Sequence, residues 1–130
     1  MIDHTGIRVA DLELSLAFYL RALAPLGYEV RKRIPGAVGL GVVARHGVSL
    51  DPGGDFWIAA AEPLVPRSHV AFSAADRAAV DAFHAAALAA GGRDNGGPGV
   101  RRLYHPDYYA AFVLDPDGYN IEAVCHRPAR

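Results

Sequence analysis

The chain contains an internal repeat in which each copy opens on a histidine. The segment from His4 to Gly27 recurs from His69 to Gly92, at an offset of 65 residues. The residues of the first copy that recur are His4, Ala10, Asp11, Ala17, Phe18, Ala22, Leu23, Ala24 and Gly27. A duplicated unit folds the same way twice, so we expect related positions to face each other across one shared site. The histidine pair is therefore the first candidate for function.

Composition limits the partners that such a chain can have. Its 130 residues suffice for one domain, or for two small modules that share a core. The formal net charge of −1 provides no broad basic field, so we expect no nucleic-acid or membrane partner and a small-molecule ligand instead. No signal peptide or apolar run of ~18 residues is seen, which predicts a cytoplasmic protein. Cys125, the single cysteine, is expected to be a small buried hydrophobe.

Hydrophobic periodicity predicts the same order of elements in each copy, a strand, a helix and three further strands. Asp11 and Asp76 stand where the strand period gives way to the helical one, so both are predicted N-caps. The strands expected after the helices span residues 28–34, 37–44, 55–60, 100–104, 108–114 and 120–125. The modules are predicted over 1–62 and 68–130, joined by a linker at 63–67 into one structural domain. The glycine-rich stretch 91–99 is expected to be a loop, either a mobile lid or a solvated connection.

Strand alternation separates the histidines from the face that packs on the helices. In the first strand the apolar side chains are expected to pack on the helix, which leaves His4, Gly6 and Arg8 on the opposite face. The fifth strand repeats this arrangement with His69 and Ala71. The small residue beside each histidine leaves room for a ligand. Arg8 is either an anion-binding residue or a solvated strand end.

A glutamate near the C-terminus is the third candidate. The segment Leu114–Ala123 resembles Leu50–Ala59 at an offset of 64, which aligns Glu122 with Ile58. Alternation places Glu122 opposite the apolar face of its strand. A carboxylate in so apolar a strand needs a partner, because removing its charge from water costs several kcal/mol. A divalent cation shared with His4 and His69 is the partner that the duplication suggests.

With these residues the chain resembles the glyoxalase, bleomycin-resistance and extradiol-dioxygenase superfamily, also called the vicinal oxygen chelate fold. The runs HVAF and DPDGYNIEAV are typical of it. The resemblance implies an α+β fold in which two tandem βαβββ modules form a curved, partly open mixed barrel with the helices outside. It implies a metal bound by His4, His69 and Glu122. Glyoxalase I adds a fourth ligand where Ile58 is expected here, which counts against lactoylglutathione lyase activity. Members commonly form homodimers, and the site lies either within one chain or between two.

Two imidazoles and one carboxylate leave coordination positions open on a divalent ion such as Fe, Mn, Zn, Ni or Co. A substrate with vicinal oxygens can fill them, and the cation then stabilises developing negative charge. Enolate formation, epoxide opening and dioxygen attack all need this stabilisation of developing negative charge. The expected function is therefore that of a metal-dependent lyase, isomerase or dioxygenase. The alternative is a metal-free protein that binds a drug, of the bleomycin-resistance type.

The acid or base must come from neighbouring side chains. His105 is the preferred candidate, followed by Tyr109 and Tyr108, of which alternation allows at most one to face the site. The remaining histidines have no counterpart in the repeat and are assigned to the surface: His46, His84 and His126.

Overall fold

The computed structural model describes residues 1–44 and 47–129. The first module comprises β1 (Thr5–Val9), α1 (Leu12–Ala22), a short 3-10 helix η1 (Ala24–Leu26), β2 (Tyr28–Ile34), β3 (Ala37–Val42) and β4 (Phe56–Ala60). The second comprises β5 (His69–Ser73), α2 (Arg77–Ala89), β6 (Arg93–Asp94), β7 (Gly99–Val100), β8 (Tyr109–Leu114) and β9 (Asn120–Cys125).

The modules have related topologies, which agrees with the duplication. The first sheet has the strand order β1-β4-β3-β2, and the second has the order β5-β9-β8-β6, with β7 also paired to β8. In each sheet the first strand of the module pairs in parallel with the last, and the other pairs are antiparallel. The fold is therefore α+β with two mixed sheets. Within the described part of the chain no strand pair joins them, so the expected barrel is not closed here.

The helices begin where the sequence predicts. The Asp11 side chain accepts a hydrogen bond of 3.1 Å from the Leu14 amide, and the Asp76 side chain accepts one of 2.8 Å from the Ala79 amide. Each carboxylate satisfies an amide that has no partner within its helix, and it lies at the positive end of the helix dipole. The prediction of two aspartate N-caps is confirmed.

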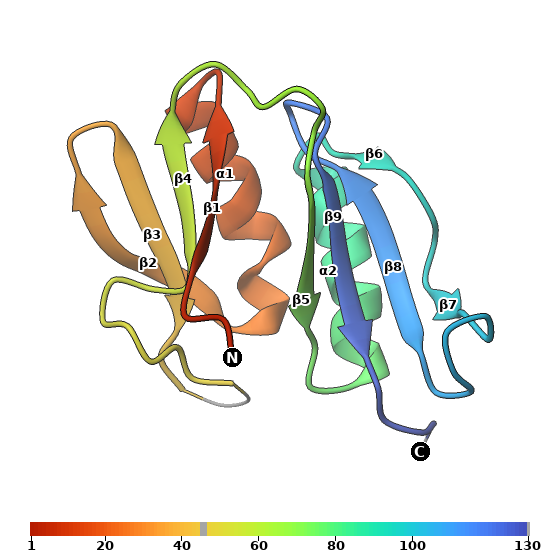
Figure 1. Cartoon of the computed structure of the whole chain (residues 1–130). Coiled ribbons are helices and arrows are strands. Elements are labelled where there is room, and N and C mark those ends of the chain that lie inside the picture. Colours follow the sequence, from red (N-terminus) through yellow and green to blue (C-terminus); the bar gives the residue numbers. More distant parts are fainter. Residues whose placement is uncertain (45–46, 130) are drawn as a thin grey trace.

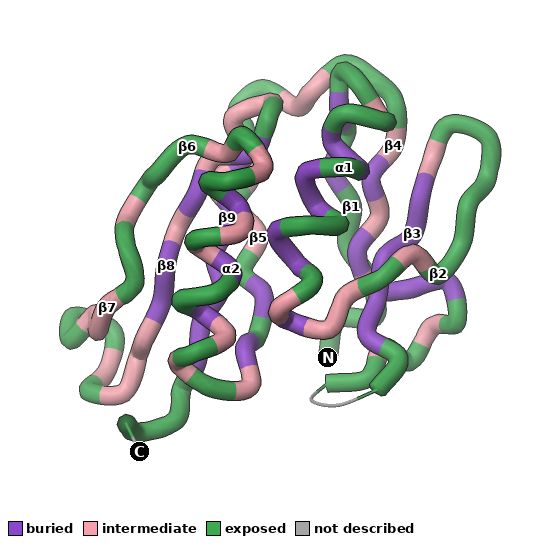
Figure 2. The backbone as a smooth tube through the Cα atoms, turned by 180° about the vertical axis from the view of Figure 1, so that it is seen from behind, coloured by how far each residue is buried: buried purple, intermediate pink, exposed green. Residues whose placement is uncertain are grey.

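Both helices lie side by side on one face of the sheets (Figures 1 and 2). The opposite face, which carries His4 and Arg8 of the first module and His69 and Glu122 of the second, is called here the helix-free face. The buried apolar side chains of both modules form one cluster, and Cys125 belongs to it as expected. Among the described residues no helix is long and apolar enough to cross a membrane.

Aromatic side chains cross the boundary between the modules. The rings of Phe56 in the first module and Phe72 in the second meet edge to face, with centroids 5.0 Å apart. Tyr19 extends this contact within the first module to Phe56, and Tyr28 makes a second contact across the boundary with Phe72. Because burial of such a side chain contributes roughly 1.5–3 kcal/mol, the contact holds the modules together.

Polar contacts fix the same boundary. The Tyr19 hydroxyl donates a hydrogen bond to the buried carboxylate of Asp115, and the Tyr119 hydroxyl donates one to the Arg8 carbonyl at 2.6 Å. Tyr119 also accepts a hydrogen bond from the Leu64 amide in the connection between the modules. The last turn of the second module is thus attached to α1, to β1 and to the connection.

Two predictions for the second module are wrong. The predicted strand 100–104 ends at Val100, because Arg101 turns back and donates side-chain hydrogen bonds to the carbonyls of Gly97 and Gly99. The predicted loop 91–99 contains β6 and the start of β7, which pair with the two ends of β8. Gly96, at φ 140°, separates the two short strands, because such a backbone conformation favours glycine.

The first sheet ends in an exposed cationic strand. β2 is its outermost strand and carries Arg31, Lys32 and Arg33 in succession, close to a bulge in its pairing with β3. Arg33 forms an exposed ion pair of 3.3 Å with Glu13 on α1.

Candidate functional site

The most chemically distinctive contact on the helix-free face joins His69 and Glu122. Their atoms Nε2 and Oε1 lie 3.2 Å apart on the adjacent strands β5 and β9. The Glu122 side chain is 3% exposed, whereas that of His69 is 46% exposed. A nearly buried carboxylate therefore lies directly beneath an accessible imidazole.

The backbone fixes which nitrogen of His69 faces the carboxylate. Nδ1 lies 2.9 Å from the carbonyl oxygen of Asn120, which can only accept a hydrogen bond, so Nδ1 carries the proton. In the neutral ring Nε2 then presents its lone pair to Glu122. This orientation by a backbone carbonyl is typical of histidines that bind metals through the other nitrogen.

Tyr108 provides the second contact to the glutamate. Its hydroxyl donates a hydrogen bond of 2.5 Å to Glu122 Oε2. Burial, together with the acceptor carboxylate, raises the pKa of Tyr108 to about 12, so the hydroxyl is a neutral donor at pH 7. Tyr109 lies elsewhere, because its hydroxyl donates to Asp81 on α2 and its ring lies under Arg77. Of the two tyrosines, the structure brings Tyr108 to Glu122.

A pair of histidines lies beside Tyr108. His105 Nε2 and His126 Nδ1 are 2.8 Å apart, and both rings meet the Tyr108 ring nearly edge to face. His105 Nδ1 accepts a hydrogen bond of 3.1 Å from the Asp107 amide, so in the neutral pair His105 donates through Nε2 to His126. His126 has no counterpart in the repeat and was therefore not predicted in this group, although strand alternation from Glu122 puts it on the same face.

The other two histidines assigned to the surface are not part of this group. His84 forms an ion pair of 3.0 Å with Asp94 and its side chain is 14% exposed, whereas His46 lies outside the described residues.

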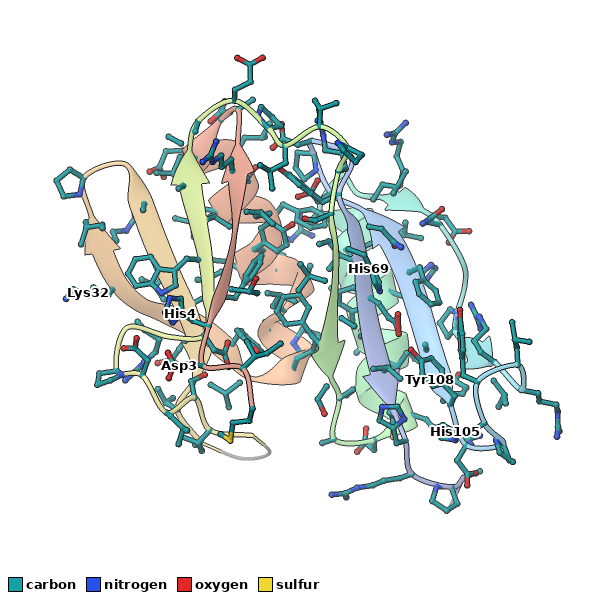
Figure 3. All side chains as sticks on the ribbon, viewed as in Figure 1. Asp3, His4, Lys32, His69, His105 and Tyr108 are labelled. Atoms are coloured by element: carbon teal, nitrogen blue, oxygen red, sulfur yellow. The ribbon has the colours of Figure 1, made fainter. Side chains whose placement is uncertain are left out.

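His4 does not join His69 and Glu122. The only close group of three candidate ligands among the described residues is Asp3, His4 and Asp51, with ligand atoms within 4.8 Å of one another. The hydrogen bond to Asp3 raises the pKa of exposed His4, and the charge of Asp51 acts in the same direction. Figure 3 shows His4 over the first sheet and His69 over the second. Both nevertheless line one cavity of about 340 Å³ between the modules.

Strand register changes the equivalence assigned to Glu122. Glu122 pairs with Ala71 on β5, and Gly6, the counterpart of Ala71, pairs with Trp57 on β4. The alignment with Ile58 is therefore wrong by one residue, and Ile58 is buried in the core. The position that mirrors Glu122 is occupied by an indole, which cannot serve as a metal ligand.

The donor set fits a divalent cation. Two lone-pair donors, His69 Nε2 and Glu122 Oε1, face each other at 3.2 Å, and only a proton or a cation between them makes this contact favourable. Two ligands of one ion, each bound at about 2.1 Å, span such a separation. The arrangement can therefore bind a divalent cation, which would act as the electrophile. Tyr108 is available as a neutral hydrogen-bond donor, and the pair of His105 and His126 can transfer protons.

Comparison with protein families identifies the family of the chain. The model of the Glyoxalase/Bleomycin resistance protein/Dioxygenase superfamily matches residues 1–123. The chain belongs to this superfamily, and the resemblance seen in the sequence is confirmed.

Solved structures show the same fold. A glyoxalase/bleomycin resistance protein from Albidiferax ferrireducens T118 is 30% identical with a TM-score of 0.76, and the match covers 97% of this chain and 98% of that chain. A family enzyme from Burkholderia phytofirmans PsJN is 20% identical with a TM-score of 0.71, covering 97% and 98%. Lactoylglutathione lyase from Agrobacterium tumefaciens is 19% identical with a TM-score of 0.65, covering 96% and 92%. The comparison with curated proteins gives no match.

Proposed function

We propose that the chain is a metal-dependent enzyme that acts on a small substrate with vicinal oxygens, as a lyase, isomerase or dioxygenase. The observation that carries this proposal is the contact between His69 and Glu122, in which an oriented imidazole faces a buried carboxylate at 3.2 Å. His4 is the third ligand in the proposal. The bound cation would supply a Lewis acid that polarises the chelated oxygens.

The surrounding residues have distinct roles in this proposal. Tyr108 holds Glu122 in place through its hydrogen bond and is a neutral donor. The pair of His105 and His126 transfers protons at the rim of the site, where His126 is exposed. Tyr109 is not given a role in the site, since its hydroxyl is bound to Asp81.

We further infer that His4 completes the site of a second copy in a homodimer. One way to bring His4 to the pair in its own chain is a movement of one module relative to the other. Such a movement would break the buried hydrogen bond between Tyr19 and Asp115 and the aromatic contacts at the boundary. Pairing two copies through their helix-free faces leaves these contacts intact. It would also complete the barrel that each chain leaves open, in keeping with the symmetric dimers that soluble proteins most often form.

Metal analysis tests the function. Protein purified without chelators and incubated with Fe(II), Mn(II) or Zn(II) should retain about one ion per chain after desalting. The Glu122→Gln and His69→Ala variants should lose that ion, whereas the matched control Glu13→Gln, an exposed helix glutamate, should keep it. Retention of stoichiometric metal by Glu122→Gln would show that the ligand assignment is wrong.

A thermal-shift screen of diols, hydroxy-ketones and glycopeptide drugs, with and without metal, then separates the enzyme from a binding protein. Stabilisation by diols or hydroxy-ketones only in the presence of metal supports the enzyme. Metal-independent stabilisation by a drug, in protein that binds no metal, would overturn the proposal in favour of drug sequestration.

A further inference from the structure

The helix-free face of the first module carries an aromatic side chain where the second module has its metal-binding carboxylate. Trp57 pairs with Gly6 on β1, as Glu122 pairs with Ala71 on β5. Gly6 is two residues from His4, and side chains two residues apart on a strand share a face at about 7 Å spacing. Trp57 therefore lies beside the proposed third ligand on the same face.

The neighbouring strand makes room for the indole. A Cβ atom on Gly39, the partner of Trp57 on β3, would lie 2.7 Å from the ring atoms Cε2 and Cζ2. Gly53 in the loop before β4 lies at the same ring edge. The side chain is partly exposed, and within the described residues its N–H donates no hydrogen bond. An indole held against two glycines presents an aromatic surface beside His4.

Two cations without ion partners flank this surface. Arg8 follows Gly6 by two residues on β1, and Lys32 on β2 pairs with Gly39 in the same row as Trp57. Neither side chain takes part in a salt bridge in the described part of the molecule. Figure 3 shows both His4 and Lys32 at the first sheet, with Lys32 at its outer strand. Across the first sheet, the side chains thus change from the candidate ligand His4 to the aromatic ring of Trp57 and then to the positive charge of Lys32.

We propose that Trp57, Arg8 and Lys32 form a subsite for the part of the substrate that extends beyond its chelating oxygens. The subsite selects a flat aromatic ring that carries an anionic group, with the ring against Trp57 and the anion held by one of the two cations, which lie on the opposite edge strands β1 and β2. Aromatic rings pack favourably against each other, and both guanidinium and ammonium groups bind carboxylates. This inference rests on the proposed function, because it needs the oxygens of the same molecule to reach the metal beside His4.

The single tryptophan of the chain allows a direct test. Protein labelled with 5-fluorotryptophan gives one 19F resonance, which reports on Trp57 without interference from ligand absorbance. Three probes are titrated into metal-loaded protein: 3,4-dihydroxybenzoate, neutral 1,2-dihydroxybenzene and glycerate. The first combines vicinal oxygens, ring and anion, the second lacks the anion, and the third lacks the ring. We expect 3,4-dihydroxybenzoate to shift the resonance with at least about tenfold higher affinity than 1,2-dihydroxybenzene, and glycerate not to shift it.

Charge variants identify the cations. The double variant Arg8→Met/Lys32→Met should bring the affinity for 3,4-dihydroxybenzoate to within about twofold of that for 1,2-dihydroxybenzene. The control Arg33→Met removes an arginine of the same sheet that is paired with Glu13 on the helix side, and it should bind as the unaltered protein does. The two single variants then show which of these cations binds the anion.

Failure of this inference is distinguishable from failure of the function. If the protein binds metal through Glu122 but 3,4-dihydroxybenzoate leaves the 19F resonance unmoved, the subsite is wrong and the function stands. Equal affinities for the charged and neutral probes, or a double variant that binds like the control, would also overturn the subsite. If the metal is absent yet the resonance shifts in a charge-dependent way, the ring and anion subsite is supported and the metal-dependent reaction is wrong.

Discussion

Tyr19 on α1 donates a hydrogen bond of 2.5 Å to Asp115, so a side chain of the first module satisfies a carboxylate that the second module buries. The same carboxylate accepts hydrogen bonds from the amides of Asp117 and Tyr119, which shape the turn before β9. The turn that begins the glutamate strand is therefore held by the neighbouring module. This relationship links the stability of the fold to the placement of the candidate site.

Tyr19→Phe should lower the free energy of unfolding by about 1–3 kcal/mol at pH 7, because it leaves a buried carboxylate oxygen without its donor. Denaturant unfolding followed by circular dichroism measures this. Tyr109→Phe removes a hydroxyl that is bound to exposed Asp81 and should cost less. Equal losses in the two variants would contradict the role given to the buried contact.

The stability of the Tyr19→Phe variant should also depend on pH in a defined direction. Burial raises the pKa of Asp115, whereas the Tyr19 hydrogen bond lowers it, so removing Tyr19 raises this pKa further. The folded state then binds a proton more readily than the unfolded state, and stability is lost as pH rises from the unfolded value of about 4 through the folded pKa. Unfolding curves at pH 4 and pH 7 should show a smaller difference between variant and parent at pH 4.

Tyr108→Phe should weaken metal binding about 10- to 100-fold, because Glu122 loses the donor that holds its second oxygen. Calorimetric titration with Zn(II) or Mn(II) measures the affinity. The adjacent tyrosine provides the control, since Tyr109→Phe alters a contact on the helix side. An unchanged affinity in Tyr108→Phe would remove this residue from the proposed site.

Mixing two inactive variants tests whether the site lies between chains. His4→Ala and Glu122→Ala are each expected to bind little metal. After unfolding and refolding together in equal amounts, a dimer with shared sites should recover about one site in four, since a mixed dimer contains one intact site and one with both substitutions. Recovery of no metal would indicate that all three ligands come from one chain.

Gly39→Ala should destabilise the protein by about 1–3 kcal/mol, because the added methyl group meets the Trp57 ring and the backbone oxygen of Gly53. Gly97→Ala is the control, because an added Cβ there meets no atom within 4 Å. Thermal unfolding compares the two variants. Equal melting temperatures would show that the space beside Trp57 and Gly53 accommodates the added methyl group without loss of stability.

Features set by local chemistry could be predicted from the sequence. Asp11 and Asp76 cap helices through amides three residues away, and alternation placed His69 and Glu122 on the face without helices. Strand register could not be predicted, because it depends on pairing between distant segments. The Leu50 and Leu114 segments align well through their turns, yet the pairing of β4 with β1 puts Trp57 and not Ile58 opposite Gly6.

The distance between the candidate ligands was beyond sequence reasoning for a related reason. A duplication predicts that His4 and His69 occupy similar places in their modules, but the angle between the modules is set by contacts such as that of Tyr119 with Arg8 and Leu64. The pair of His105 and His126 likewise arises from a loop and a strand end that meet only in the folded chain.

The cationic run on β2 has a consequence for how copies of this protein meet. Unsatisfied backbone groups along an outer strand invite another chain to extend the sheet, and charged side chains discourage this. Arg31, Lys32 and Arg33 would place like charges against each other if two such strands aligned. Growth into open-ended polymers through the β2 edge is therefore disfavoured. Self-association through the helix-free face, which ends at a dimer, is compatible with this charge pattern.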